Sequence, residues 1–343
     1  MLTPSRGRGG GIERYVDALE WAFTAQGVEY RRLDLQGSGP AAHARLLAQC
    51  RKQLRACDAP ARLVVVHRAL LPVASLLARE RPACGISVVC HGTDVWGTRL
   101  RARHLVENYL MRSSRVRVVA VSSFTAGTLF ESCPATILPP GLSQTWFGTL
   151  VSACADVQPR DPGVQLVTVF RLADWRDKGL PELLDAVDRL GQPDVRLVVC
   201  GSGKPSVELQ RLVSAHGFCT LRSGLTNDEL ALQLAAADLF VLATRTRFGR
   251  TAYGEGFGLV LLEAQVAGTP VIAPAHGGSH DAYVDGITGL APADESAEAL
   301  RSVLDELTRH PEQLAQMSKQ AADWARQCFA PEKYASLAVA RLL

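Results

Sequence analysis

Short apolar runs rich in β-branched residues alternate with helical stretches along almost the whole chain. Runs without polar alternation are typical of strands in a parallel sheet that helices cover on both faces. Strands are predicted at Arg62–His67, Ile86–Cys90, Val116–Ser122, Val164–Phe170, Val195–Cys200 and Asp238–Ala243. Helices are predicted at Ile12–Gln26, His43–Ala56, Leu180–Leu190 and Asp228–Ala237, and from Pro311 onward. This alternation predicts the α/β class with doubly wound parallel sheets.

A length of 343 residues predicts two domains of ordinary size. The stretch Thr149–Gly163 has no periodicity and contains two prolines, which is typical of a linker. We therefore expect a Rossmann-like domain at 1–150, a linker at 151–163, a second Rossmann-like domain at 164–325 and a helix at 326–343 that packs back on the first domain. Only Met1–Arg6 precedes the first glycine, so the first strand is either a stub or begins upstream of this sequence.

Composition and charge narrow the function classes. A net charge of +3 is too small to favour nucleic-acid binding. None of the nine cysteines has C-x-x-C spacing, so neither a zinc site nor a redox pair is indicated, and a reducing cytoplasm fits best. No apolar run approaches the ~20 residues that a membrane-spanning helix needs. Arginine far outnumbers lysine, which suggests a GC-rich bacterial genome. We expect a soluble cytoplasmic protein.

A glycine-rich turn at Gly7–Gly11 precedes the first predicted helix. Consecutive glycines let a backbone approach a ligand, and a helix N-terminus favours an anion there. A dinucleotide fingerprint with Asp34 on the ribose is an alternative, but Ile12 stands where the third glycine belongs. A flexible turn without function is the third possibility.

A polar loop follows the predicted strand Ile86–Cys90. His91, Thr93 and Asp94 lie on this loop, and Trp96 closes it. Ligands bind at the carboxyl ends of strands in such sheets, so these residues are candidates for a binding site. A structural role for a histidine at a strand end remains equally open.

Two basic residues flank a strand–helix turn in the second half. Arg171 follows the strand Val164–Phe170, and Lys178 lies seven positions later, just before a helix. A guanidinium and a mobile ammonium group at one turn suit a diphosphate. The nearby run CGSGKPS is not a P-loop because Pro205 follows the lysine, but its glycines can form a backbone wall against a nucleotide.

Two glutamates eight positions apart lie in the run GEGFGLVLLEAQVAGTPVIA (254–273). Glu255 lies in a glycine-rich turn, and Glu263 lies two turns into the helix that follows. Backbone N–H groups at Gly256–Leu259 can point at an anion, aided by the helix dipole. Glu263 would then reach ribose hydroxyls, and Glu255 would face the group beyond the phosphates. The spacing fits a nucleotide diphosphate sugar.

Taken in order, these motifs resemble those of the retaining glycosyltransferases of family 4. The matching stretches are GGGIERYV, HGTD, VSS, RLADWRDKG, CGSG, GLTNDEL and EGFGLVLLE, the last being the E-x7-E element of that family. AGTPVIAPAHGGSHDAYVDGITGL continues the pattern, so the resemblance covers almost the whole chain. It implies the GT-B fold, in which two Rossmann-like domains face each other across a cleft.

The resemblance also implies a role for each matching residue. Arg171 and Lys178 would neutralise the leaving diphosphate, and His91 would contact the sugar near the reacting carbon. The implied catalytic residues are His91, Glu255, Arg171 and Lys178. The implied donor-binding residues are Gly10, Gly11, Arg171, Lys178, Gly201, Gly203, Gly224, Leu225, Glu255, Gly256, Phe257, Gly258, Leu259 and Glu263. Asp94 and Trp96 are the acceptor candidates.

The implied reaction moves a sugar, with retention, from a nucleotide diphosphate sugar to a small-molecule, lipid or natural-product acceptor. The chain has no D-x-D sequence, so we expect no metal and no cofactor. Arginine, lysine and a helix dipole would stabilise the departing charge instead. Two alternatives stay open: an NAD-dependent oxidoreductase that uses the Gly7–Gly11 turn, and a sugar-nucleotide epimerase of the same architecture.

Two further stretches have open roles. The amphipathic stretch Arg99–Arg117 has arginines at both ends and an apolar face at Leu105, Val106, Tyr109 and Leu110. We expect this face to pack in the core; peripheral membrane contact is the alternative that we do not favour. The loop 244–257 carries basic side chains at 245, 247 and 250, which either hold an anionic part of a substrate or are simply solvated.

Overall fold

The computed structural model describes residues 1–4, 10–56, 60–92, 94–96, 102–130, 132–157, 163–249 and 252–343, without the side chains of 102 and 103. The chain divides into two compact units. Unit 1 comprises residues 1–141, 248–252 and 332–343, and unit 2 comprises 142–247 and 253–331. The junction was expected at 151–163, whereas helix α6 (Gln144–Ala153) belongs to unit 2.

Unit 1 is built on a parallel sheet in the order β2-β1-β3-β4-β5-β6. Its strands are β1 (Leu2–Thr3), β2 (Leu33–Asp34), β3 (Arg62–Val65), β4 (Gly85–Cys90), β5 (Val116–Ala120) and β6 (Ala135–Ile137). The two-residue β1 lies between β2 and β3, where Leu2 pairs with Leu33 and Val65. The first strand is therefore short, and Leu2 is nevertheless buried in the core.

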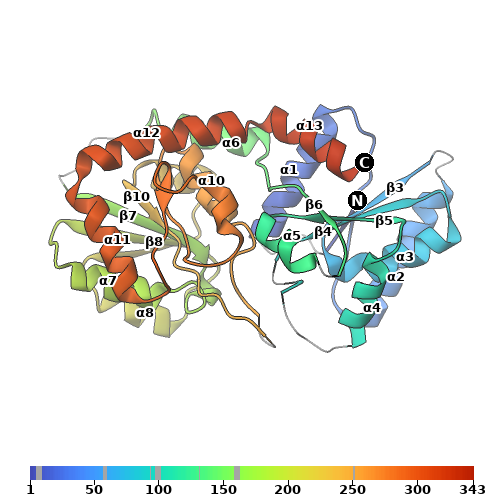
Figure 1. Cartoon of the computed structure of the whole chain (residues 1–343), viewed down its shortest axis with the longest axis horizontal. Helices are drawn as coiled ribbons and strands as arrows, with labels where there is room; N and C mark the ends of the chain where they lie inside the picture. Colours follow the sequence, from blue (N-terminus) through green and yellow to red (C-terminus); the bar gives the residue numbers. More distant parts are fainter. Residues whose placement is uncertain are drawn as a thin grey trace. The chain divides into compact units, whose positions relative to one another are not determined.

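Helices cover both faces of this sheet (Figure 1). They are α1 (Gly11–Ala25), α2 (Gly39–Arg55), α3 (Leu71–Glu80), α4 (Ala102–Met111), α5 (Ser123–Leu129) and α13 (Pro331–Leu342), with a 3-10 turn η1 (Arg68–Leu70). Side chains alternate between the faces: Ile86 and Val88 join the core that α2 and α3 cover. Ser87, between them, donates its hydroxyl to the Leu342 carbonyl oxygen of α13 at 2.6 Å.

Helix α4 corrects one expectation. Of the apolar face that we expected in the core, Leu105, Val106 and Tyr109 are 59%, 49% and 73% exposed, whereas Leu110 is partly buried and packs against the core. Among the described side chains of the helix, those of Glu107 and Met111 are buried. Arg68 Nε donates to Glu107 Oε2 at 2.8 Å, and both residues are at most 3% exposed. This buried ion pair orients the helix, because a carboxylate and a guanidinium leave water only as a pair.

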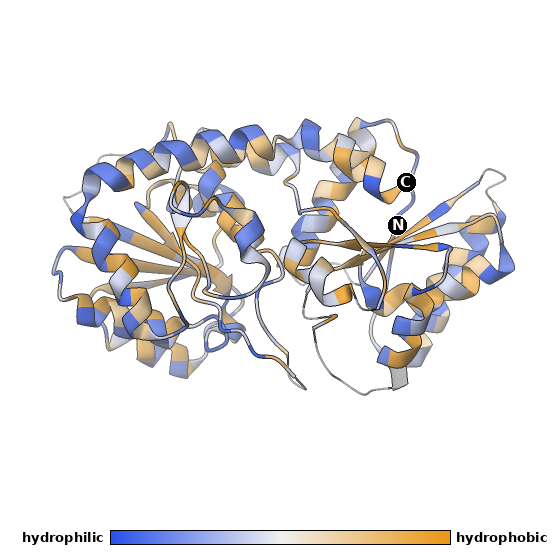
Figure 2. Cartoon of the chain, in the orientation of Figure 1, coloured by the Kyte–Doolittle hydropathy of each residue, from blue (hydrophilic) through white to orange (hydrophobic). Residues whose placement is uncertain are grey.

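Unit 2 has a second parallel sheet, in the order β12-β11-β10-β7-β8-β9. Its strands are β7 (Val164–Arg171), β8 (Val195–Ser202), β9 (Cys219–Ser223), β10 (Leu239–Val241), β11 (Val271–Ile272) and β12 (Gly289–Leu290). The strands of both sheets are predominantly hydrophobic (Figure 2), as the continuous apolar runs predicted. In β8, for example, Leu197 and Val199 are completely buried.

Helices α7, α8 and α11 cover one face of this sheet, and α6, α9, α10 and α12 cover the other (Figure 1). Their bounds are α7 (Leu180–Leu190), α8 (Val207–Ser214), α9 (Asn227–Ala235), α10 (Leu259–Val266), α11 (Ala297–Arg309) and α12 (Pro311–Cys328), with short 3-10 turns η2 (Leu172–Asp174) and η3 (Gly278–Ala282). The described residues contain no helix long and apolar enough to cross a bilayer.

Candidate active site

A cation and a carboxylate meet at the carboxyl edge of the unit 2 sheet. Lys178 Nζ lies 2.7 Å from Glu255 Oε2 and 3.4 Å from Thr244 Oγ1. The Thr244 hydroxyl donates to the same carboxylate oxygen at 3.0 Å. Burial alone would lower the pKa of Lys178, but the adjacent Glu255 carboxylate outweighs it, so the pKa is raised and the ammonium group stays charged at neutral pH.

A glycine next to the lysine makes this meeting possible. Gly179 has φ +69°, and a Cβ built on it would lie 2.0 Å from the carbonyl oxygen of Ala243. Only glycine combines this left-handed conformation with so close an approach. The turn that carries Lys178 therefore packs directly on the chain that leaves β10, one residue before Thr244.

The backbone around Glu255 is fixed in a similar way. Gly278 N–H donates to the Glu255 carbonyl oxygen at 2.8 Å. Gly258, at φ +81°, precedes the first residue of α10, and no side chain caps this helix start. Leu261 N–H donates to the Gly258 carbonyl oxygen at 2.8 Å, whereas the N–H groups of Leu259 and Val260 receive no side-chain cap and are open to a ligand. This helix start lies beside the Glu255 side chain, since a Cβ on Gly258 would be 3.3 Å from Glu255 Cγ.

Arg171 stands at the end of β7, at the same edge of the sheet. Its side chain is 59% exposed, and its Nη2 lies 2.6 Å from Asp174 Oδ2. The carbonyl oxygen of Asp174 accepts from Lys178 N–H at 2.9 Å, so both cations belong to one turn. The two basic residues predicted from the sequence are therefore neighbours on one turn, with Lys178 held in place and Arg171 reaching toward solvent.

Glu263 is buried, at 3% exposure, within α10. Its Oε1 accepts from the indole Nε1 of Trp146 on α6 at 3.0 Å. The N-cap Ser143 holds the start of α6, since its hydroxyl accepts from Trp146 N–H at 3.4 Å. Trp146 escaped the sequence analysis because nothing in its local pattern connects it with a carboxylate 117 positions later.

The remaining predicted donor residues of unit 2 have mixed surroundings. Gly201 is required by packing, because a Cβ there would lie 2.3 Å from the Phe170 carbonyl oxygen. Gly203 and Gly224 have φ +89° and +71° and open space around them. Leu225 follows Gly224 and leads into the capped start of α9. Phe257 is 3% exposed, so only the backbone of the turn formed by Gly256, Phe257 and Gly258 is available to a ligand.

The basic loop after β10 is tied down by carboxylates. Arg245 pairs with Glu182 and with Glu295, and Arg247 pairs with Asp177. These ion pairs fasten the loop to Asp177 and Glu182 at the start of α7, next to Lys178, and to Glu295 just before α11. The two arginines are thus neutralised within unit 2, which favours a structural role over the holding of an anionic substrate.

Unit 1 carries the predicted histidine loop. The N–H groups of His91 and Gly92 donate to Asp94 Oδ1 at 3.0 and 2.9 Å. The ring Nε2 of His91 donates to the Val66 carbonyl oxygen at 2.7 Å, which leaves Nδ1 as an acceptor. Burial lowers the pKa of His91, although Asp94 opposes this, so the ring is neutral at pH 7. Thr93 lies outside the described residues.

Among the residues that the structure describes, two buried polar atoms of this loop have no hydrogen-bond partner: Asp94 Oδ2 and Trp96 Nε1. Unsatisfied buried groups are rare, and they are candidates for contact with a substrate. Gly10, at φ +120°, precedes α1, which begins at Gly11 and has no side-chain cap. Of the glycine turn at 7–11, residues 7–9 lie outside the described part.

In the dinucleotide alternative Asp34 binds a ribose, but in this structure its carboxylate already has hydrogen-bond partners. Asp34 Oδ1 accepts from Arg32 Nε at 2.8 Å and also from the Thr3 hydroxyl. The carboxylate proposed for a ribose is therefore engaged within the sheet edge.

Solved structures share this fold. The chain superposes on sucrose-phosphate synthase from Thermosynechococcus elongatus with a TM-score of 0.79, covering 99% of this chain and 96% of that one at 20% identity. It superposes on Anabaena HepE in complex with UDP with a TM-score of 0.75, covering 99% and 98% at 15% identity. At these identities the likeness establishes the fold alone, which is GT-B, with two parallel six-stranded sheets covered by helices.

Sequence comparisons identify the family. Residues 157–324 match the model of the family described as "Glycosyl transferases group 1". A GDP-mannose-dependent α-(1-6)-phosphatidylinositol monomannoside mannosyltransferase of Mycolicibacterium smegmatis is 30% identical over 275 residues, which are 75% of this chain and 70% of that relative. The chain therefore belongs to the glycosyl transferases of group 1 and is a hexosyltransferase-type enzyme with the GT-B fold.

Proposed function

We propose that this enzyme transfers a hexosyl group from a nucleotide diphosphate sugar to a hydroxyl of a lipid or small-molecule acceptor, with retention and without a metal ion. The observation that carries the proposal is the cluster of Lys178, Glu255 and the uncapped start of α10 at one edge of the unit 2 sheet. The cluster combines a charged ammonium group, free backbone donors and a helix dipole. This combination suits an anion that gains negative charge as it leaves.

In the proposed reaction the bond between the anomeric carbon and the diphosphate oxygen breaks, and a bond to the acceptor oxygen forms on the same face. The acceptor proton passes to the departing phosphate. Lys178, with Arg171 at the same turn, offsets the charge of the diphosphate. Glu255, freed from Lys178 as the diphosphate takes its place, is then available to hydroxyls of the sugar.

The other proposed roles belong to Glu263 in unit 2 and to His91, Asp94 and Trp96 in unit 1. Glu263 would accept hydrogen bonds from the ribose hydroxyls. Asp94 and Trp96 of unit 1 stay the candidates for acceptor binding, because Asp94 Oδ2 and Trp96 Nε1 are buried without a hydrogen-bond partner among the described residues. His91, as a neutral ring, stays the candidate for contact with the sugar.

Two relatives suggest which compounds to try first. The mycobacterial relative is named for GDP-mannose and for a phosphatidylinositol monomannoside acceptor, and a structure of similar fold contains UDP. We therefore propose GDP-mannose first and UDP-glucose second as donors. A glycolipid with a free sugar or inositol hydroxyl is the first acceptor to try.

The test is a transfer assay that follows each labelled donor into a lipid product by mass spectrometry, with and without EDTA. We expect transfer with one donor and no loss of activity in EDTA. The one-bond C1–H1 NMR coupling of the transferred sugar should match that of the donor. The variant Lys178→Met should lower kcat at least 100-fold, about 2.7 kcal/mol of transition-state stabilisation. The exposed Lys319→Met on α12 is the matched control and should retain full activity. Equal rates in the two variants would refute the assignment of Lys178.

A further inference from the structure

The loop after β10 packs on the turn that carries Lys178. Across this loop, Arg247 and Tyr253 exchange two backbone hydrogen bonds, at 2.8 and 2.9 Å. The Arg247 guanidinium in turn pairs with the carboxylate of Asp177, the residue that precedes Lys178. The antiparallel bridge and the ion pair together therefore fix Tyr253 near Lys178.

The aromatic ring of Tyr253 lies near two cations. Lys178 Nζ is 5.9 Å from the ring centroid, and Arg247 Cζ is 5.7 Å from it. An aromatic ring attracts a cation within about 6 Å through the negative charge of its face. The side chain is half-buried, so part of it stays accessible to a ligand. Tyr253 therefore belongs to the cluster of Lys178 and Glu255, although its position in the sequence gave no sign of this.

The hydroxyl of Tyr253 is not needed for these ring contacts, because a phenylalanine ring attracts a cation in the same way. The hydroxyl interacts electrostatically with both Lys178 and Glu255. Burial raises the pKa of Tyr253 and outweighs the opposite effect of Lys178, so the hydroxyl keeps its proton at neutral pH. A protonated phenol is a hydrogen-bond donor. The cluster thus contains a second side chain, beside the Lys178 ammonium group, that donates hydrogen bonds.

We propose that the Tyr253 hydroxyl donates a hydrogen bond to the β-phosphate of the nucleotide diphosphate sugar. This inference rests on the proposed function, in which Lys178 binds the diphosphate and Glu255 binds the sugar. The phosphate that lies between these two residues is the one bonded to the sugar, which is the β-phosphate. Its oxygens accept several hydrogen bonds at once, so Lys178 and Tyr253 can both bind it. The β-phosphate gains negative charge as the sugar leaves, so Tyr253 would also stabilise the transition state.

The experiment is isothermal titration calorimetry of the full chain with GDP, UDP, ADP and dTDP. The diphosphate that binds the wild type is then titrated into Tyr253→Phe, which lacks the hydroxyl and keeps the ring. We expect its affinity to fall about tenfold or more, because a hydrogen bond to a charged group is lost. The affinity of the matching nucleoside monophosphate, measured by competition, should stay unchanged, because that nucleotide has no β-phosphate.

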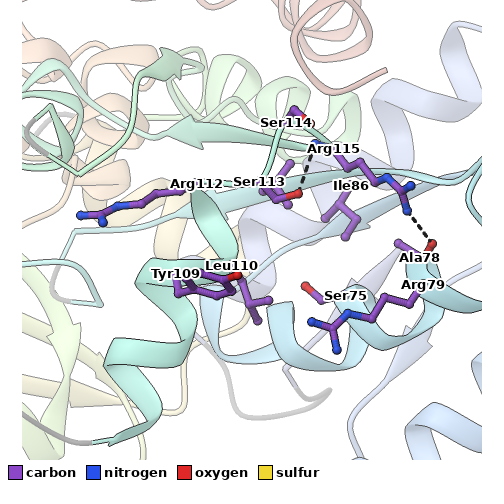
Figure 3. A pocket seen from close by; sticks show the side chains of 11 residues that line it. Ser75, Ala78, Arg79, Ile86, Tyr109, Leu110, Arg112, Ser113, Ser114 and Arg115 are labelled. Atoms are coloured by element: carbon purple, nitrogen blue, oxygen red, sulfur yellow. Dashed lines mark hydrogen bonds between the residues drawn. The ribbon is translucent and has the colours of Figure 1, made fainter.

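Two further variants serve as controls. Tyr109→Phe removes the same hydroxyl from an exposed ring on α4 of unit 1, at the wall of a pocket between α3, α4 and the turn before β5 (Figure 3). This variant should bind the diphosphate like the wild type. Tyr253→Leu removes the ring together with the hydroxyl, so it also removes the cation contact with Lys178. It should lower the affinity at least as much as Tyr253→Phe does.

Three results would overturn the contact with the β-phosphate. The first is an unchanged diphosphate affinity in both variants of Tyr253. The second is a loss in Tyr253→Leu alone, which would mean that the ring positions Lys178 and that the hydroxyl binds no phosphate. The third is an equal loss of monophosphate and diphosphate affinity in Tyr253→Phe. A wild type that binds none of the four diphosphates would instead refute the proposed function, and this inference with it.

Discussion

The hydrogen bond between Trp146 and Glu263 gives a prediction that needs no substrate. Trp146→Phe removes the indole N–H from a carboxylate that is 3% exposed, at a donor–acceptor distance of 3.0 Å. A hydrogen bond to a buried charged group contributes about 1.5–3 kcal/mol. A change of 1 kcal/mol shifts the melting temperature of a unit this size by about 2–4 °C, so we expect a fall of about 3–12 °C.

Two further variants distinguish the loss of this hydrogen bond from the loss of ring volume: a control at another tryptophan and a variant of the partner, Glu263. Trp324→Phe on α12 removes the same part of an indole, from a ring whose centroid lies 5.3 Å from that of Phe329. It should lower the melting temperature less than Trp146→Phe does. In a double-mutant cycle with Glu263→Leu, followed by circular dichroism in urea, the coupling energy should be about 1.5–3 kcal/mol. A coupling energy near zero would refute the idea that Trp146 positions Glu263.

The remaining predictions concern stability. Gly179→Ala should destabilise the chain by about 1–3 kcal/mol more than Gly191→Ala in thermal melting, because both have positive φ but only the first would clash with a backbone carbonyl. Arg68→Met should lower the free energy of unfolding in urea by about 3–5 kcal/mol, since it removes the guanidinium group that pairs with the buried Glu107 carboxylate. Adding Glu107→Gln should restore part of this loss. An unchanged urea midpoint in Arg68→Met would contradict the prediction. Burial raises the pKa of Cys200 to about 12, so its contribution to stability is complete below the thiol's ordinary pKa and is lost as the pH rises toward 12. The fall in urea midpoint between pH 8 and 11 should therefore be smaller in Cys200→Ala than in the wild type.

The sequence predicted the long buried strands and missed the short or polar ones. The strands β4, β7 and β8 have six to eight residues each and are rich in valine, leucine and isoleucine, which identifies them without further context. β1, β11 and β12 have two residues each, so no periodicity can reveal them. β9 lies at the edge of its sheet and is half-exposed and polar, as in Arg222 and Ser223, because only one neighbour covers it.

For the candidate site, the sequence predicted residues that are neighbours along the chain but not contacts between distant residues. The spacing of Arg171 and Lys178 predicted that these two residues share one turn. The pattern around Glu255 and Glu263 predicted that a helix begins between the two glutamates. Local spacing could not predict that Lys178 meets Glu255, 77 positions later, or that Trp146 meets Glu263.

The orientation of α4 was wrong for the same reason. Periodicity identifies which residues share a side of a helix, but it does not say which side is buried. Arg68, 39 positions before Glu107, turns Glu107 inward, because a buried guanidinium requires a carboxylate partner.

The central claim is that unit 2 binds a nucleoside diphosphate between Lys178 and the start of α10. The most direct measurement is thermal melting with GDP, UDP, ADP, dTDP and NAD, in the wild type and in Lys178→Met. At 100 times its dissociation constant a ligand adds about 2.7 kcal/mol, which corresponds to a rise of about 5–11 °C. We predict this rise with one nucleoside diphosphate, its loss in Lys178→Met and no rise with NAD. A rise with NAD alone, or an equal rise in the variant, would contradict the claim.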